Sequence, residues 1–329
     1  MRKNRYTVLC LSVCVMVAAC SFERIVEIDP LDIKPHWVLN SLLQTDRDSS
    51  FFYLTESRSV YIPDSIRYAG VLKGFQPIKD ATIQVSINGN VEELLYSHQD
   101  TAYVLGKRLH ANDDVKVVVN HTDKRLEART VLPWLPEVLS VDTSTVYKLN
   151  EGYSERYLMF KVKIKDRPGE RNYYRLLVDG FFTTDAGLIN PYGYYTYSPY
   201  DTEDLVLLDG TMGGGYNNDL GLAFSPVNLF SVFRDRSFEG EEYTLKFYVK
   251  RLDLMGNFYK PIQYHLHVGL QSVSEELYKY FSTLQASMYA NWDDISEPVV
   301  VYSNINGGLG ILGSSNEVKL FRHTEEIEN

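Results

Sequence analysis

Apolar and polar residues alternate around short turn segments, and this pattern most restricts how the chain can fold. In Ala81–Ile87, alanine, isoleucine and valine alternate with polar residues; Asn88-Gly89-Asn90 follows, and then Val91–Tyr96. A period of two buries one face of a strand, and asparagine and glycine tolerate the positive φ angles of a tight turn. The segment therefore predicts a β-hairpin.

Further short strands are predicted on both sides of this hairpin, at 37–43, 50–56, 115–119 and 125–131. Short strands separated by turn residues are typical of a β-sandwich. We therefore expect an N-terminal sandwich over residues 36–133, of the immunoglobulin-like or carboxypeptidase-regulatory-like kind. It ends where Pro133 and Pro136 bracket Trp134.

A second β-rich sandwich domain is predicted over residues 134–325, with strands at 157–165, 172–178, 244–252 and 262–270. One helix is also expected. Ser272-Val273-Ser274-Glu275 has the spacing of a capping box, and apolar residues then recur every three to four positions until about Asn291. The chain is therefore expected to be mainly β, with two sandwich domains and one α-helix in its C-terminal half.

The N-terminus has the features of a lipoprotein signal peptide. Three basic residues precede an almost wholly apolar run over 6–19, and Val17-Ala18-Ala19 places two small residues before Cys20. A basic start, an apolar core and a small-residue cleavage site are typical of export signals, and the cysteine indicates lipid attachment. We expect a signal peptide over 1–19, lipidation of Cys20 and a lipidated tether over 20–35. The alternatives are an ordinary signal peptide with a chance cysteine, or a short buried helix.

Cysteine usage and charge restrict the function further. Cys10, Cys14 and Cys20 are the chain's three cysteines, so a mature chain starting at Cys20 has no other thiol for disulfides, zinc fingers or cysteine nucleophiles. The net charge of −10 becomes −13 once the three basic residues of the leader are removed. So acidic a surface is repelled by nucleic acid, and we expect no nucleic-acid partner.

Two motifs suggest chemistry that their context does not support. Gly308-Leu309-Gly310-Ile311-Leu312-Gly313 matches the dinucleotide-binding spacing, but no apolar helix is predicted after it, so we interpret it as the glycine-lined start or bend of a strand. His265 and His267 fall on one strand face and could chelate a metal, but no third ligand is apparent, so we expect them to face solvent or a tyrosine. We predict no catalytic residues, no metal and no cofactor, although a glycosidase needs only two carboxylates.

A tyrosine-rich segment is the best candidate for ligand binding. Residues 183–222 are rich in glycine, tyrosine, asparagine and aspartate, which predicts a long loop or insertion, and such loops are usually functional or disordered. Tyrosine offers a stacking face and a hydroxyl at low entropic cost, which suits a glycan or peptide. The alternative is that these rings only pack the loop onto the sandwich. The candidate residues are Tyr192, Tyr194, Tyr195, Tyr197 and Tyr200.

Several segments resemble the outer-membrane lipoproteins of Bacteroidetes grouped as domain-of-unknown-function family 4249. They are the lipobox at Cys20, residues 38–43, 78–83 and 166–176 with the Asn-Tyr-Tyr-Arg-Leu core, 233–240 and 302–311. The resemblance implies an outer-membrane lipoprotein, commonly encoded beside a TonB-dependent receptor, and it implies no established catalytic residue.

These observations lead us to expect a non-catalytic lipoprotein, anchored in the outer membrane by lipid, that assists a TonB-dependent transporter. It would capture a small ligand, a glycan or a peptide, or stabilise the receptor assembly. Surface-exposed and periplasmic orientations both remain open. The alternatives are a surface structural or adhesion module, and a carbohydrate-active enzyme.

Overall fold

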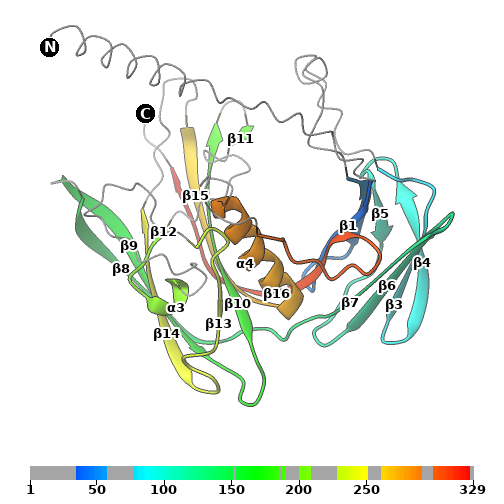
Figure 1. The fold of residues 1–329 in the computed structure, drawn as a ribbon. Helices are drawn as coiled ribbons and strands as arrows, with labels where there is room; N and C mark the ends of the chain where they lie inside the picture. The colour runs from blue at the N-terminus through cyan, green and yellow to red at the C-terminus, as the bar shows by residue number, and fades with distance from the viewer. Residues whose placement is uncertain are drawn as a thin grey trace, which may run out of the picture. The chain divides into compact units, whose positions relative to one another are not determined.

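The computed structural model describes most of the chain from residue 35 onward. The described residues are 35–57, 77–150, 153–184, 187–189, 200–208, 228–250, 261–290 and 299–326. Their strands form a twelve-stranded sheet and a four-stranded sheet (Figure 1). The prediction of a mainly β chain with sandwich-like packing is confirmed.

The first half of the large sheet comes from the N-terminal third of the chain, in the order β1-β2-β5-β4-β3-β6-β7. The strands are β1 (Trp37–Gln44), β2 (Ser50–Glu56), β3 (Thr82–Ile87), β4 (Asn90–Ser97), β5 (Ala102–Leu105), β6 (Asp114–His121) and β7 (Lys124–Val131). β3 and β4 form the predicted hairpin, with Asn88 at φ 51° and Gly89 at φ 89° in its turn. Alternate residues of β3 and β6 are buried in a common core that also includes Leu39, Phe52 and Tyr103.

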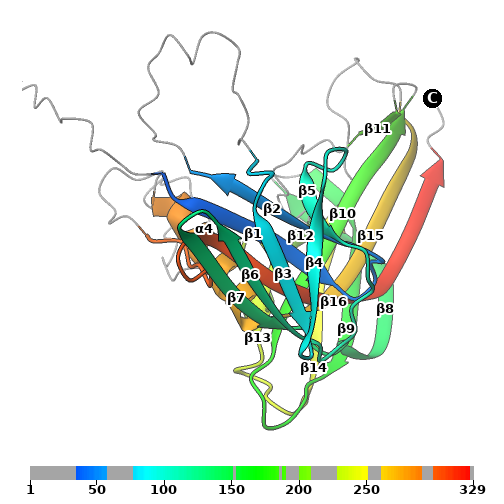
Figure 2. The same ribbon diagram turned by 90° about the vertical axis from the view of Figure 1, so that its right-hand side faces the viewer.

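The second half of the large sheet comes from the C-terminal part of the chain, in the order β11-β10-β15-β16, with β13 also paired to β10. The strands are β10 (Tyr173–Thr184), β11 (Gly187–Ile189), β13 (Val232–Arg234), β15 (Pro261–Val273) and β16 (Leu309–Glu326). β16 runs antiparallel to β15 along most of its length, as Figure 2 shows. Its first residues also run parallel to β1, from Val38 opposite Leu309 to Gln44 opposite Ser315. One strand therefore joins the two halves into a single sheet.

The four-stranded sheet packs on the C-terminal half of the large sheet. It consists of β12 (Tyr200–Asp201), β14 (Glu242–Lys250), β9 (Tyr153–Lys165) and β8 (Glu137–Asn150), in that order. Phe160 of β9 and Phe247 of β14 stack with their ring centroids 5.0 Å apart. They belong to a second core with Val178 of β10 and Val268 of β15. A short helix, α3 (Leu205–Leu208), adds two buried residues to this core.

The predicted C-terminal helix is present as α4 (Glu275–Ala290), and it lies against β10, β13 and β16 (Figure 1). Its start corrects one prediction. Ser274 caps the helix, because its hydroxyl accepts the Leu277 N–H at 3.3 Å, whereas Ser272 is still a residue of β15. Leu277 and Phe281 pack on Val273 and Ile311 in a third core.

None of the helices within the described residues is both long and apolar enough to span a membrane.

Candidate functional site

Most of the residues predicted to form a site lie outside the described part of the chain. These are Cys20, Tyr192, Tyr194, Tyr195 and Tyr197. Tyr200 opens β12, where its backbone is opposite Val249 of β14, but its side chain is not among those described. Lipidation of Cys20 and ligand binding by the tyrosine-rich segment therefore stay predictions.

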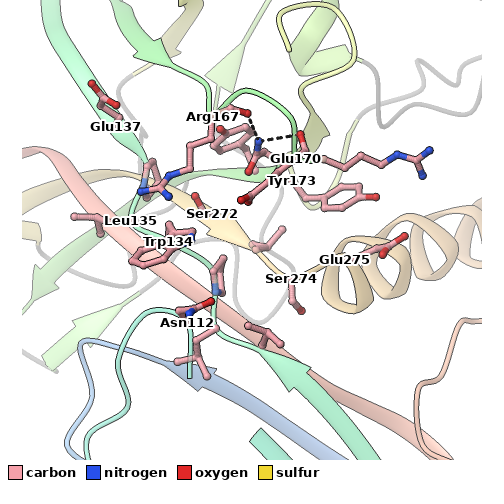
Figure 3. A pocket seen from close by; sticks show the side chains of 18 of the residues that line it. Asn112, Trp134, Leu135, Glu137, Arg167, Glu170, Tyr173, Ser272, Ser274 and Glu275 are labelled. Atoms are coloured by element: carbon pink, nitrogen blue, oxygen red, sulfur yellow. Dashed lines mark hydrogen bonds between the residues drawn. The ribbon is translucent and has the colours of Figure 1, made fainter. Parts of the chain in front are cut away.

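The structure instead reveals a cavity of about 300 Å³ that the sequence did not indicate (Figure 3). Three segments supply most of its lining: the connection from β7 to β8, the turn from β9 to β10, and the junction of β15 with α4; Asn112, between β5 and β6, completes it. The residues that carry its polar and aromatic character are Trp134, Glu137, Lys165, Arg167, Glu170, Arg171, Tyr173, Ser274, Glu275 and Glu276.

Trp134 and Arg167 form one wall of the cavity. Pro133 and Pro136 flank the tryptophan, and prolines disfavour regular pairing, so this segment crosses between sheets as an extended connection. The Arg167 guanidinium carbon lies 4.5 Å from the centroid of the Trp134 ring, which is cation–π geometry. Trp134 is nevertheless 41% exposed, and the neighbouring Leu135 is 50% exposed. The wall therefore presents an aromatic and apolar surface beside a fixed positive charge.

Tyr173 and Glu275 stand on the side of the cavity next to α4. The Tyr173 ring packs on Tyr278, with centroids 4.7 Å apart, and Lys279 Nζ donates to Glu275 Oε1 at 2.9 Å. The hydrogen bond from Lys279 lowers the pKa of Glu275, and burial together with the Glu275 carboxylate raises the pKa of Tyr173. At neutral pH this side of the cavity therefore carries a fixed carboxylate beside a neutral phenol.

The cavity thus combines charges of both signs with an aromatic wall. Its lining includes three cationic side chains, Lys165, Arg167 and Arg171, and four carboxylates, Glu137, Glu170, Glu275 and Glu276. Such a site can bind a polar or zwitterionic ligand by charge-assisted hydrogen bonds and stacking. The residues lining it include no histidine and no cysteine.

The two strand histidines lie elsewhere, on the face of β10, β15 and β16 opposite the second core. His265 Nε2 is 2.7 Å from the Thr183 hydroxyl, and its ring stacks on Phe181 at 4.8 Å. His267 is 3.4 Å from a Glu317 oxygen and 3.8 Å from an Asp179 oxygen. The two histidines were expected to face solvent or a tyrosine; their neighbours are instead threonine, phenylalanine and carboxylates. Within the described ranges, no group of three or more histidine, cysteine or acidic residues could hold a metal ion.

A comparison with protein families matches residues 23–320 to the family described as a domain of unknown function (DUF4249). The chain belongs to this family. A search of curated proteins found no match. Membership in DUF4249 supplies no residue roles, so the chemistry of the site rests on its geometry.

Two of the segments that resemble DUF4249 build the turn that forms one side of the cavity. The buried Asp166 carboxylate accepts the Tyr174 hydroxyl at 2.5 Å and the Gly240 N–H at 2.8 Å. The Asp235 carboxylate accepts the Asn172 N–H at 2.6 Å. Burial raises the pKa values of Tyr174 and Asp235, and the nearby Asp166 raises both further. These DUF4249 segments therefore hold in place the turn that carries Arg167 and Tyr173, whereas Asp166 and Asp235 themselves do not line the cavity.

Another of these segments, 302–311, lies against both β1 and β7; its Asn306 is bridged to Glu127 of β7. The Asn304 side chain donates to the Leu312 carbonyl at 2.9 Å and accepts the Leu312 N–H at 2.9 Å. A Cβ atom at Gly308 would lie 2.6 Å from the Trp37 carbonyl oxygen, so the strands approach too closely for a side chain. The glycine-rich motif is thus the start of a strand, as expected, and it has a packing role in this DUF4249 chain.

Proposed function

We propose that this protein is a non-catalytic envelope lipoprotein that assists a TonB-dependent outer-membrane transporter, by capturing a ligand or by stabilising the receptor assembly. The observation that carries the proposal is the lipobox, Val17-Ala18-Ala19-Cys20, which follows an apolar run. The family match begins at residue 23, three positions after the cysteine. Lipid attached at Cys20 would anchor the sandwich domains through the tether over 20–35.

The character of the cavity supports binding rather than bond cleavage. Trp134 and Arg167 form a stacking surface, and Glu137, Glu170 and Arg171 can orient a polar ligand. A short peptide fits this chemistry because it carries amide groups and both charges. A glycan also fits, because sugar rings stack on aromatic faces and their hydroxyls bond to carboxylates and guanidinium groups.

The anchor is tested by expressing the full chain and its Cys20→Ser variant in a Bacteroidetes host. We expect the wild-type protein to partition into the detergent phase, with lipid mass on its first residue, and Cys20→Ser to remain in the aqueous phase. Ser21→Ala, next to the cysteine, is the matched control and should behave as wild type. A wild-type protein in the aqueous phase, without lipid mass, would contradict the anchor.

The accessory role is tested by affinity purification of the tagged full chain from native membranes. We expect an outer-membrane barrel to co-purify, and a deletion strain to grow poorly on the nutrient that this barrel imports. Trp134→Ala should reproduce the growth defect if ligand capture is the role, whereas Tyr53→Ala, on an exposed strand face away from the cavity, should not. Recovery of no barrel from cross-linked membranes would remove the support for the proposal.

A further inference from the structure

Strand β8 is a long edge with a neighbour on one side only in the described part of the chain. The sheet order β12-β14-β9-β8 leaves its outer side without a partner among those strands (Figure 1). β8 is 14 residues long, with the sequence EVLSVDTSTVYKLN, and it contains no proline and no glycine. Proteins usually protect such edges with prolines, bulges or several lysines, because an open row of N–H and C=O groups pairs readily with another strand.

The protections that β8 carries are confined to its ends. Its register shift lies between Val138 and Ser140, and its one lysine is Lys148. Beyond the shift, valine, threonine and tyrosine predominate, and these residues favour strands. Tyr147 is 70% exposed and Leu149 is 83% exposed. An apolar, strand-forming edge of this kind has the properties of an interface.

We infer that β8 pairs antiparallel with β8 of a second copy of this chain, about a twofold axis at Thr145. In this register Asp142 lies opposite Lys148 of the second copy, and the symmetry makes that pairing twice. A twofold interface uses the same surface on both copies, so a self-complementary strand is what it requires.

Charge complementarity across four strands supports this register. Within one copy, Asp142 is already opposite Lys161 of β9, and Lys148 is opposite Glu155. The paired edges would therefore give a row of Lys161, Asp142, Lys148 and Glu155, with alternating charges on one face. Opposite charges on directly facing residues stabilise a sheet, whereas like charges destabilise it.

The other face of the strand is complementary in the same register. Val141 lies opposite Leu149 of the second copy, and Thr143 lies opposite Tyr147. The two most exposed apolar side chains of β8 are thereby covered by a valine and a threonine. Moving the axis to a neighbouring residue places Val146 or Asn150 opposite Asp142 and loses the charge pairing. The pairing with a second copy is thus specific to the axis at Thr145.

The first test uses the full-length protein in native membranes and a single new cysteine. Residues directly opposite in an antiparallel pair have Cα atoms about 4.5–5.5 Å apart, within the range of a disulfide. Thr145→Cys should therefore give, on mild oxidation, a reducible band at twice the mass. Thr143→Cys is the matched control, because its two copies would be offset by about 13 Å along the strand, and it should give no such band. The unmodified protein reports any background from Cys20.

The second test measures self-association of the detergent-extracted protein by sedimentation. Asp142→Asn should weaken it and Asp142→Lys should weaken it further, by about tenfold, because attraction becomes repulsion at two symmetric positions. Leu139→Lys adds a charge at an exposed position in the register shift, opposite no residue of β8 in the second copy, and should leave the association within about twofold of wild type. Circular dichroism confirms that each variant is folded.

The outcomes separate the possible partners of the edge. A Thr145→Cys band together with the graded Asp142 series supports the twofold pairing. A Thr145→Cys product with a different protein, or a monomer unaffected by any variant, would overturn it. Neither result bears on lipidation or on the transporter, so this inference and the proposed function can fail separately.

Discussion

At the residue scale, glycines set how closely β16 can approach its neighbours. Gly310 has φ +108°, and a Cβ atom there would collide with the Leu39 carbonyl oxygen and lie 2.8 Å from Asn40 Oδ1. A positive φ favours glycine because other residues place Cβ against the backbone. Position 310 therefore requires glycine for two reasons: its backbone has a positive φ, and the neighbouring strand leaves no space for a side chain.

Gly310→Ala is expected to lower the free energy of unfolding by about 2–4 kcal/mol, because it adds strain at a positive φ to a clash with backbone that cannot move aside. Gly106→Ala is the control, since a Cβ at Gly106 meets nothing within 4 Å and the residue has no positive φ. Its effect should stay within about 0.5 kcal/mol. Equilibrium unfolding in urea measures both, and equal effects would refute the close-approach explanation.

Asp235 should make stability depend on pH in the direction opposite to most carboxylates. Burial raises its pKa in the folded protein, so the folded state binds this proton more tightly than the unfolded state. Its contribution to stability is therefore present below its unfolded pKa and is lost as the pH rises through the folded value. We expect the wild type to gain stability relative to Asp235→Asn as the pH falls from 7 towards 4. Thermal unfolding of both proteins across that range measures the difference, and a difference that stays constant or changes in the other direction would contradict the shift.

The cavity residues show why site prediction fails at this scale. Trp134 and Arg167 are 33 positions apart, and Ser274 follows more than 100 positions later. None belongs to a motif with fixed spacing, and only the fold brings the three segments together. Two sequence features point to this region, and neither is specific for a site: the prolines on both sides of Trp134, and the charged turn over 166–170.

At the element scale, the start of α4 depends on one hydroxyl. Ser274 Oγ accepts the N–H of Leu277 and that of Ser314, each at 3.3 Å, so it caps the helix and fastens it to β16. The sequence pattern selected Ser272 because a glutamate follows three positions later, but pairing with Tyr174 and Asn316 retains Ser272 in the sheet. Tertiary pairing thus overrides the local capping signal.

Ser274→Ala should lower the free energy of unfolding by about 1–2 kcal/mol, since it leaves two buried N–H groups without an acceptor. Ser272→Ala should change it by less than about 0.5 kcal/mol, because that hydroxyl caps nothing. Chemical denaturation followed by far-ultraviolet circular dichroism compares the pair. A larger loss for Ser272→Ala would restore the original capping assignment.

Strand prediction succeeded where one face of the strand is buried and failed where that condition is absent. β3 alternates between exposed and buried residues, whereas Leu94 is the one buried residue of β4, and the hairpin was predicted with its turn. Residues 311–316 of β16 are all buried, so no period of two marks them. β8 is exposed along most of its length, so it also shows no period-two alternation between buried and exposed residues.

At the scale of the whole molecule, β16 contributes to all three cores. Leu312 packs among the side chains of the N-terminal strands, Ile311 lies under α4, and Leu320 and Phe321 contact the second core. Its parallel pairing with β1 joins residues about 270 positions apart. The local pattern of apolar and polar residues does not show which distant strand a strand pairs with. The prediction of two domains therefore did not include a shared sheet.

This shared strand leads to a prediction about cooperativity. Leu312 is fully buried in the N-terminal core, although it lies within 20 residues of the chain end. Leu312→Ala should lower the free energy of unfolding by about 2–5 kcal/mol, as expected for a large-to-small change in a core. Because β16 pairs with both β1 and β15, the loss should appear in both halves of the sheet.

Hydrogen exchange of the intact protein should show faster global opening for peptides covering β1 and β15 alike. Leu95→Ala, at a position 79% exposed, should leave both rates near wild type. Faster exchange in β1 with unchanged exchange in β15 would instead mean that the halves unfold independently, and that β16 is shared in geometry but not in stability.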